Sequence, residues 1–113
     1  MATTPLRLFD TAQLTGSAAT YYTSPALTKT IIKKATFTNS DVSTPYTVTL
    51  YLIKTGGSAS TSNIIMNAAV VAPSATLEAF EIEGQVLNPG DFIQAFASTT
   101  GKIVFAASGV QIT

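Results

Sequence analysis

The residues best suited to chemistry are three neighbouring carboxylates, Glu78, Glu81 and Glu83. In an extended strand, Glu81 and Glu83 would share one face about 6.6 Å apart, a workable spacing for a general acid and base in glycoside hydrolysis. The alternative is a solvated strand face, or ion pairs with lysines across a sheet. We favour this alternative because the chain has no tryptophan platform for a sugar and no histidine.

A fourth carboxylate, Asp91, ends the tetrad Asn88-Pro89-Gly90-Asp91. A calcium ion takes about six to eight oxygen ligands, usually with several carboxylates among them. Proline at the second position and glycine at the third instead predict a type II turn with a positive φ at Gly90. We therefore interpret Asp91 as a residue that stabilises the turn.

The basic residues do not predict a nucleic-acid surface. Lys29, Lys33 and Lys34 form a small cluster, but the net charge is zero and the sequence pI is about 6.1. Nucleic-acid binders usually have a basic face and a high pI. Gly56-Gly57 opens a loop without the GxxxxGK[ST] pattern and the helix that a phosphate-binding loop needs. We predict no specific nucleic-acid partner.

Tyrosine is the remaining binding candidate. Tyr21, Tyr22, Tyr46 and Tyr51 would suit a surface for sugars or peptides, because each ring combines apolar area with a hydroxyl. The alternative, which we favour, is that they pack the sheets and the contacts between subunits.

Missing residue types exclude most catalytic classes. The chain contains no histidine, cysteine or tryptophan, so it has no disulfide, no thiolate nucleophile, no imidazole ligand and no Ser-His-Asp triad. We predict that the protein is not an enzyme and has no catalytic residue, no cofactor-binding residue and no metal site.

The surface is unusually poor in charge. Charged residues make up 11% of the 113 residues, against about 25% in typical soluble domains, while 19 threonines and 10 serines supply the polarity. Hydroxyl groups are cheaper to desolvate than charges, so the composition favours burial in an assembly. The simpler interpretation is a threonine-rich β-protein, since threonine suits a half-exposed pleated surface.

Short runs rich in β-branched and aromatic residues, separated by turn residues, predict strands and no helix. The serine- and glycine-rich segment 55–63 predicts a mobile loop, and residues 1–14 predict an extended N-terminal arm that contains the first strand. The expected strands are Leu6–Leu14, Thr20–Thr23, Lys29–Asn39, Tyr46–Lys54, Ile64–Ala72, Thr76–Glu83, Val86–Leu87, Phe92–Ser98 and Lys102–Ile112.

This pattern predicts an all-β protein in which residues 1–113 form a single antiparallel β-sandwich or jelly-roll-like domain. Phe92–Ser98 and Lys102–Ile112 should pair as a hairpin around Thr99-Thr100-Gly101. No apolar run approaches the length of a membrane span, and the N-terminal residues lack the apolar region of a secretory signal. We expect no membrane partner and synthesis in a host cytoplasm.

The stretch VLNPGDFIQAFASTTGKIVFAASGVQI, residues 86–112, is preceded by the strands ATFTNSD and YTVTLYLI, which we take as a central strand pair. Together they resemble the small β-sandwich virion proteins of tailed bacteriophages, from about Thr28 onward. Those proteins share a PGD turn between apolar segments, a small-residue strand and a terminal strand like SGVxI. Cupins also have such turns, but their metal ligands include histidine, which this chain lacks.

The resemblance implies a structural role in the virion, as a head decoration (cement) protein or as a tail- or baseplate-associated sandwich. It implies no catalytic residue, and it makes the major capsid protein or another virion protein a partner. The alternative is a module that attaches the virion to host cell-surface glycans. Low charge and a small core further predict a homo-oligomer, a trimer, that resists dissociation at high salt.

Overall fold

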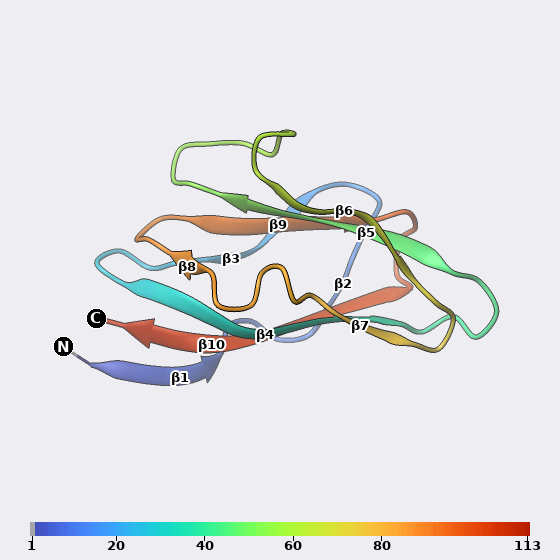
Figure 1. Ribbon diagram of the computed structural model, residues 1–113, viewed down its shortest axis with the longest axis horizontal. Helices are drawn as coiled ribbons and strands as arrows, with labels where there is room; N and C mark the ends of the chain where they lie inside the picture. Colours follow the sequence, from blue (N-terminus) through green and yellow to red (C-terminus); the bar gives the residue numbers. More distant parts are fainter. Residues whose placement is uncertain (1) are drawn as a thin grey trace.

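The structure, a computed structural model described for residues 2–113, consists of two antiparallel β-sheets packed face to face (Figure 1). Among these residues there is no helix, and so none that could cross a membrane. Sheet A contains β1 (Thr3–Arg7), β2 (Ala12–Gln13), β4 (Lys29–Asn39), β7 (Thr76–Glu78), β8 (Val86–Leu87) and β10 (Ile103–Ile112). Sheet B contains β3 (Ala19–Thr23), β5 (Tyr46–Ile53), β6 (Ile64–Val71) and β9 (Phe92–Ala97).

The strand order is that of a jelly roll. The chain forms nested antiparallel pairs, with β5–β6 innermost, then β4–β7, β3–β9 and β1–β10 outermost. Successive pairs fall in opposite sheets, and the wrapping is closed by the pairing of β10 with β4 and of β9 with β5. The predicted β-sandwich is thus confirmed, in its jelly-roll form.

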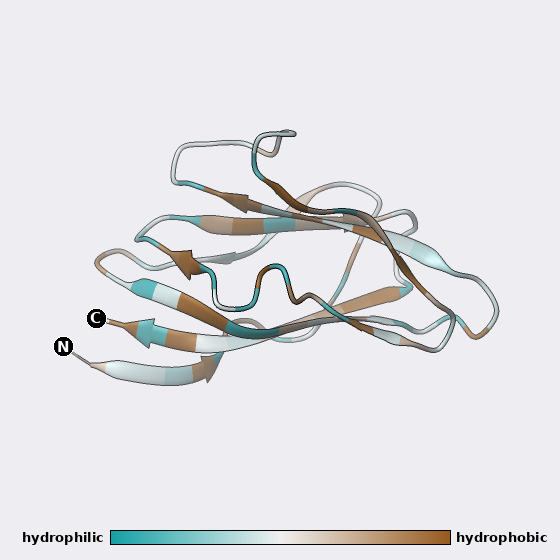
Figure 2. Cartoon of the chain, viewed as in Figure 1, coloured by the Kyte–Doolittle hydropathy of each residue, from teal (hydrophilic) through white to brown (hydrophobic). Residues whose placement is uncertain are grey.

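Alternation of apolar and polar residues places the core between the sheets. In β4, Ile32, Ala35 and Phe37 are buried against β10, and in β5, Val48 and Leu50 are fully buried. Hydrophobic residues follow the strands of both sheets in Figure 2. Each sheet therefore presents one apolar face to the other, as a sandwich requires.

A β-bulge in sheet A keeps both lysines of the sequence Lys33-Lys34 out of the core. Strict alternation would drive one of these lysines into the core, but the register shifts at Ser108 and Gly109 so that Lys34 lies opposite Ser108 and Ile32 opposite Gly109. Lys33 is the extra residue, and both lysines stay exposed. The backbones approach so closely here that a side chain at Gly109 would overlap the carbonyl oxygen of Ile31.

Two predicted strand pairings are wrong. Phe92–Ser98 and Lys102–Ile112 do not form a hairpin, because β9 belongs to sheet B and β10 to sheet A, so the turn at 99–101 crosses between the sheets. The strands β4 and β5 are likewise not a pair but lie in opposite sheets. Sequence neighbours in a jelly roll often lie in different sheets, because the chain follows the wrapped ribbon.

Two predicted strands are shorter than expected. Leu6–Leu14 is divided into β1 and β2 by a bend at residues 8–11, where the side chain of Leu8 enters the core while both strands pair with β10. Thr76–Glu83 is a strand only to Glu78. Ala79 and Ile82, three residues apart, are both fully buried, and turns rather than an extended strand allow this spacing.

The predicted turn at Asn88-Pro89-Gly90-Asp91 is confirmed. The N–H of Asp91 donates to the carbonyl oxygen of Asn88 at 2.9 Å, and Gly90 has a φ of 86°. A Cβ at Gly90 would also lie 2.7 Å from the hydroxyl oxygen of Thr55, so this position excludes side chains for two reasons.

Replacing Gly109 by alanine tests the bulge. We expect Gly109→Ala to lower the free energy of unfolding by about 2 kcal/mol, because the new methyl group must push apart the two central strands of sheet A. Gly16→Ala is the matched control, since its Cβ would come no closer than 3.9 Å to Thr100. Urea denaturation measures both variants, and equal stabilities would contradict the close approach.

Candidate functional site

The three predicted carboxylates do not form an acid–base pair. Glu78 pairs with Lys34 at 3.2 Å across β7 and β4, which is the alternative expected from the sequence. Glu83 accepts a hydrogen bond from the N–H of Ala35 at 3.2 Å, and Glu81 is exposed in the turns after β7. Each carboxylate thus faces a different environment. Within residues 2–113, acidic side chains nowhere gather in a group of three that could hold a metal ion.

Asp91 has the structural role expected for it. One carboxylate oxygen accepts from the N–H of Asn88 and the other from the N–H of Thr55, each at 3.0 Å. The side chain therefore joins the 88–91 turn to the end of β5, and both of its oxygens are occupied by backbone donors.

The tyrosines are distributed through the sandwich rather than gathered in one patch. Tyr21 lies against the rings of Phe9 and Phe105, and partial burial raises its pKa. Tyr46 bonds to a loop carboxylate, and Tyr51 stacks on Phe96 with ring centroids 6.2 Å apart. The structure therefore gives no shared tyrosine surface for a sugar or peptide.

Tyr22 belongs to a buried hydroxyl network that ties the two sheets together. Its hydroxyl lies 2.8 Å from that of Thr30 in β4, which lies 2.9 Å from the hydroxyl of Ser24. Gln111 in β10 donates to the Tyr22 hydroxyl at 2.8 Å, and Ser24 donates to the carbonyl oxygen of Thr28. Every buried side-chain polar atom in the described part of the chain has such a partner, which is how buried hydroxyls are tolerated.

Asp41 organises the loop between β4 and β5. Its Oδ1 accepts from the N–H and hydroxyl of Ser43 and from the N–H of Thr44, and its Oδ2 accepts from the hydroxyl of Tyr46 at 3.0 Å. These bonds, above all that from the Ser43 N–H, hold the pKa of Asp41 below its usual value. Desolvation and the bond to Asp41 raise the pKa of Tyr46.

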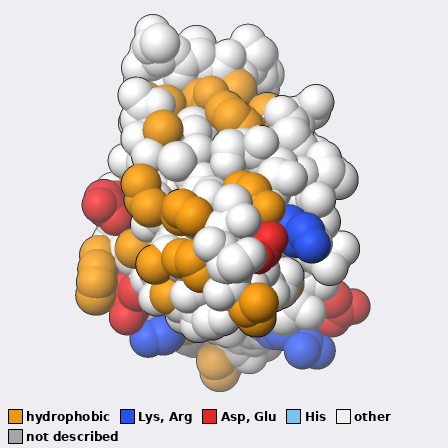
Figure 3. Space-filling view, turned by 90° about the vertical axis from the view of Figure 1, so that its right-hand side faces the viewer, with side chains coloured by type: hydrophobic (Ala, Val, Ile, Leu, Met, Phe, Trp, Pro, Cys, Tyr) orange, Lys and Arg blue, Asp and Glu red, His pale blue; other side chains and the backbone are white. Residues whose placement is uncertain are grey.

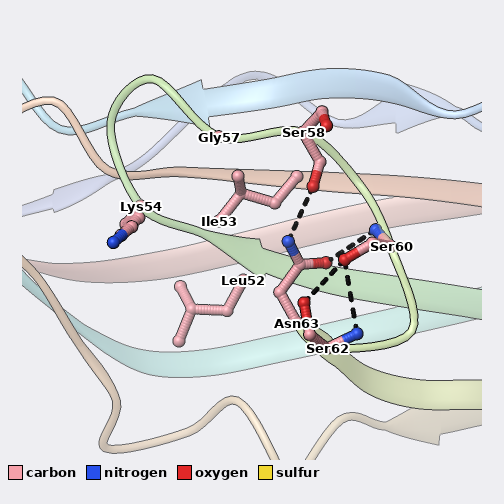
Figure 4. Close-up of a pocket in the computed structure, with 8 residues that line it drawn as sticks. All are labelled: Leu52, Ile53, Lys54, Gly57, Ser58, Ser60, Ser62 and Asn63. Atoms are coloured by element: carbon pink, nitrogen blue, oxygen red, sulfur yellow. Dashed lines mark hydrogen bonds between the residues drawn. The ribbon is translucent and has the colours of Figure 1, made fainter.

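A hollow of about 460 Å³ lies beneath the loop that follows β5 (Figure 4). Ile53 points into the ring formed by this loop and is only 1% exposed, although it lies outside the main core cluster. Gly57 passes over it, and a Cβ there would come within 3.1 Å of the isoleucine. The residues lining the hollow are Leu52, Ile53, Lys54, Gly57, Ser58, Ser60, Ser62 and Asn63.

Asn63 stabilises the loop around the hollow through two hydrogen bonds. Its amide nitrogen donates to the carbonyl oxygen of Ser58 at 2.8 Å, and its amide oxygen accepts from the N–H of Ser60 at 3.0 Å. The hydroxyls of Ser60 and Ser62 lie 2.7 Å apart. Lys54 is the single titratable residue of the lining, so the hollow suits a neutral hydroxylated ligand better than acid–base chemistry.

The sequence analysis missed this hollow, although it contained a signal. Alternation in β5 puts Ile53 on the outer face with Tyr51, and a large aliphatic residue there needs a cover. The segment 55–63 supplies that cover through its own hydrogen bonds. Its predicted mobility stays a prediction.

Large hydrophobic side chains are exposed at several other places. Figure 3 shows hydrophobic side chains gathered at the end of the molecule that carries the β4–β5 and β6–β7 connections. Val42, at 81% exposed, and Pro45 belong to the first of these connections and Ala72 to the second. The other exposed large hydrophobic residues are Leu27, Val70, Phe80 and Val86.

No protein-family model and no curated protein matches the chain. Three solved structures to which it is similar are those of infectious bursal disease virus strain Gx (TM-score 0.47, 14% identity), strain Gt (0.47, 13%) and the VP2 subviral particle (0.44, 17%). Each match covers 97% of this chain but only 30% or 31% of the viral chain. The chain thus spans less than a third of their length, and so distant a likeness supports no statement about function.

The loop around Asp41 predicts a loss of stability in acid. Because its pKa is lower in the folded than in the unfolded chain, ionised Asp41 stabilises the fold above about pH 4 and loses this effect as the pH falls through the folded pKa. We expect Asp41→Asn to weaken the fall in Tm between about pH 5 and pH 2. Asp10→Asn, at a side chain 93% exposed beside Arg7, is the control and should retain the wild-type profile.

Proposed function

We propose that the chain is a non-enzymatic structural protein of a tailed-phage particle, a decoration (cement) protein that stabilises the head by binding the major capsid protein. The observation that carries the proposal is the composition of its surface. Leu27, Val42, Phe80 and Val86 are between 47% and 90% exposed, while only 11% of all residues are charged. Such a surface suits burial in an assembly.

Both the fold and the sequence resemblance to tailed-phage virion proteins support the proposal. Jelly rolls occur in viral capsid domains, lectins and cupins, so the fold favours this class by analogy only. The segments 86–112 and 28–53, which carry the resemblance to tailed-phage virion proteins, supply β4, β5, β9 and β10, the strands at the centre of both sheets.

We further propose that the protein is a homo-oligomer, a trimer, made in the host cytoplasm and retained in the virion. Its contacts would be made by hydroxyl and apolar groups, which salt does not screen. The chain has six basic and six acidic residues, and four of these form the ion pairs Arg7–Asp10 and Lys34–Glu78, which leaves few charges for contacts between copies.

Quantitative analysis of purified particles tests this proposal. We expect the chain on intact heads in a fixed high ratio to the major capsid protein, and we expect the free protein to sediment as one oligomer at both about 0.1 M and about 1 M salt. Absence from particles, or a monomer at high micromolar concentration, would refute the corresponding part of the proposal.

The alternative function, binding of host cell-surface glycans at the tail or baseplate, is favoured by one observation. The hollow beneath residues 55–63 has hydroxyl and amide groups at its rim and the half-buried aliphatic side chain of Leu52 in its lining. Sugars need both kinds of contact. The hollow has no aromatic ring in its lining, however, so a sugar would stack on aliphatic groups only.

Titration with neutral hexoses and N-acetylhexosamines tests the alternative. If the hollow binds a sugar, amide resonances of Ser58, Ser60 and Asn63 should shift in NMR spectra, and Ser60→Ala with Ser62→Ala should reduce the shift. Ser74→Ala, in the remote β6–β7 turn, is the control. Unchanged spectra at millimolar sugar would exclude this function.

A further inference from the structure

The outer face of sheet A carries a row of apolar side chains that crosses four strands. Pro5 of β1 lies opposite Val110 of β10, Val110 lies opposite Ile31 of β4, and Ile31 lies opposite Val86 of β8. Residues directly opposite one another in antiparallel strands place their side chains on the same face and in contact distance. The four residues come from distant parts of the sequence and form one continuous row.

The row faces outward, away from sheet B. The neighbours of its members along each strand point into the sandwich: Thr30 and Leu87 are fully buried, Leu6 packs against the core, and Gln111 bonds to buried Tyr22. Since successive side chains alternate, the row itself lies on the other face. Val86 is 47% exposed, and Figure 2 shows β8 as a hydrophobic strand at the end near the two termini.

The connection between β3 and β4, at the same end of the molecule as the two termini (Figure 1), carries a further exposed apolar residue, Leu27. It lies in the turn before β4, is 90% exposed and has a φ of 58°. A leucine in the left-handed region is strained, and its exposure gains nothing for the fold. Both costs are consistent with a side chain that is buried by a partner.

Two lysines without ion partners flank the row. On β4, Lys29 and Lys33 lie two positions on either side of Ile31 and share its face. The bulge keeps Lys33 on this face together with Lys34, but only Lys34 has a carboxylate partner within the described chain, Glu78. The surface therefore combines an apolar centre with two uncompensated positive charges.

A second copy of the chain is poorly suited to neutralise these charges, because a heterologous contact between copies would need carboxylates that are mostly engaged within their own chain. An isologous contact would bring the same lysines together, and like charges across an interface are unfavourable. Nearly all carboxylates of the chain are already engaged: Asp10 with Arg7, Glu78 with Lys34, and Asp41, Glu83 and Asp91 with backbone N–H groups. Only Glu81 remains, so the charge complement must come from another protein.

We propose that the outer face of sheet A, the surface formed by Pro5, Val110, Ile31 and Val86 with Lys29 and Lys33 beside them, docks a different protein through an apolar patch bordered by carboxylates. That this partner is the virion shell protein rests on the proposed function. The docking surface itself rests on strand register, exposure and charge alone.

Site-specific photo-crosslinking in the cells that produce the chain with its natural partners tests the surface. A photoreactive phenylalanine analogue replaces Val86 or Val110 in separate experiments, and Val70 in the control, since Val70 is 63% exposed but lies on β6 of the other sheet. We expect Val86 and Val110 to give an adduct with one and the same protein, through a peptide rich in aspartate or glutamate, and Val70 to give none.

Charge reversal supplies the second arm. Lys29→Glu with Lys33→Glu should reduce the adduct about tenfold, as should raising the salt concentration to about 0.5 M, because both weaken attraction to carboxylates. Lys102→Glu should leave the yield unchanged, because Lys102 is exposed directly before β10, at the end of that strand remote from Val110. Thermal melting confirms that each variant folds.

The outcomes separate this inference from the proposed function. An acidic partner that is absent from purified particles supports the docking surface and refutes the virion role. An adduct with a second copy of the chain, an equal yield from Val70, the absence of any adduct, or indifference to charge reversal would each overturn the docking surface, whether or not the chain is found on particles.

Discussion

The pairing of β4 with β10 is the interaction on which the rest of the molecule depends. These two strands form the centre of sheet A, and their opposite residues Phe37 and Phe105 stack with ring centroids 4.5 Å apart. Phe105 also contacts Phe9 from the bend between β1 and β2, and Tyr21 from sheet B. One aromatic cluster therefore fixes the N-terminal segment and both sheets around this strand pair.

The positions of most strands could be predicted from local sequence patterns, but the pairing of the strands could not. Lys29–Asn39 is a strand with the predicted bounds. In β5, alternation accounts for the burial of Val48 and Leu50 but not for that of Thr49 and Ile53. Periodicity states only that a strand has two unlike faces. It does not say which strand lies beside it, so the turn at 99–101 looked like a hairpin although it joins two sheets.

The candidate sites also include one that the sequence could predict and one that it could not. The role of Asp91 could be predicted because the turn Asn88-Pro89-Gly90-Asp91 encodes its own geometry within four residues. The apolar row could not be, because Pro5, Val110, Ile31 and Val86 become neighbours only through three strand registers. A surface formed by residues from several strands cannot be predicted from the sequence pattern of any one strand.

Two of the sheet edges, those formed by β1 and β6, are poorly suited to pairing with a further strand. On either side of β1, Ala2 and Leu8 donate to the carbonyl oxygens of Thr113 and Ala107. Alternation therefore turns the backbone of Thr3, Pro5 and Arg7 toward the open edge, and Pro5 has no N–H to offer there. On the opposite sheet, β6 is interrupted by shifts in register and by Ala68 at a φ of 51°. The β1 edge of sheet A and the β6 edge of sheet B are thus poor templates for a further strand. On the outer face of sheet A, by contrast, the side chains of Pro5, Val110, Ile31 and Val86 form an apolar row, so the proposed partner would meet side chains there and not an open strand.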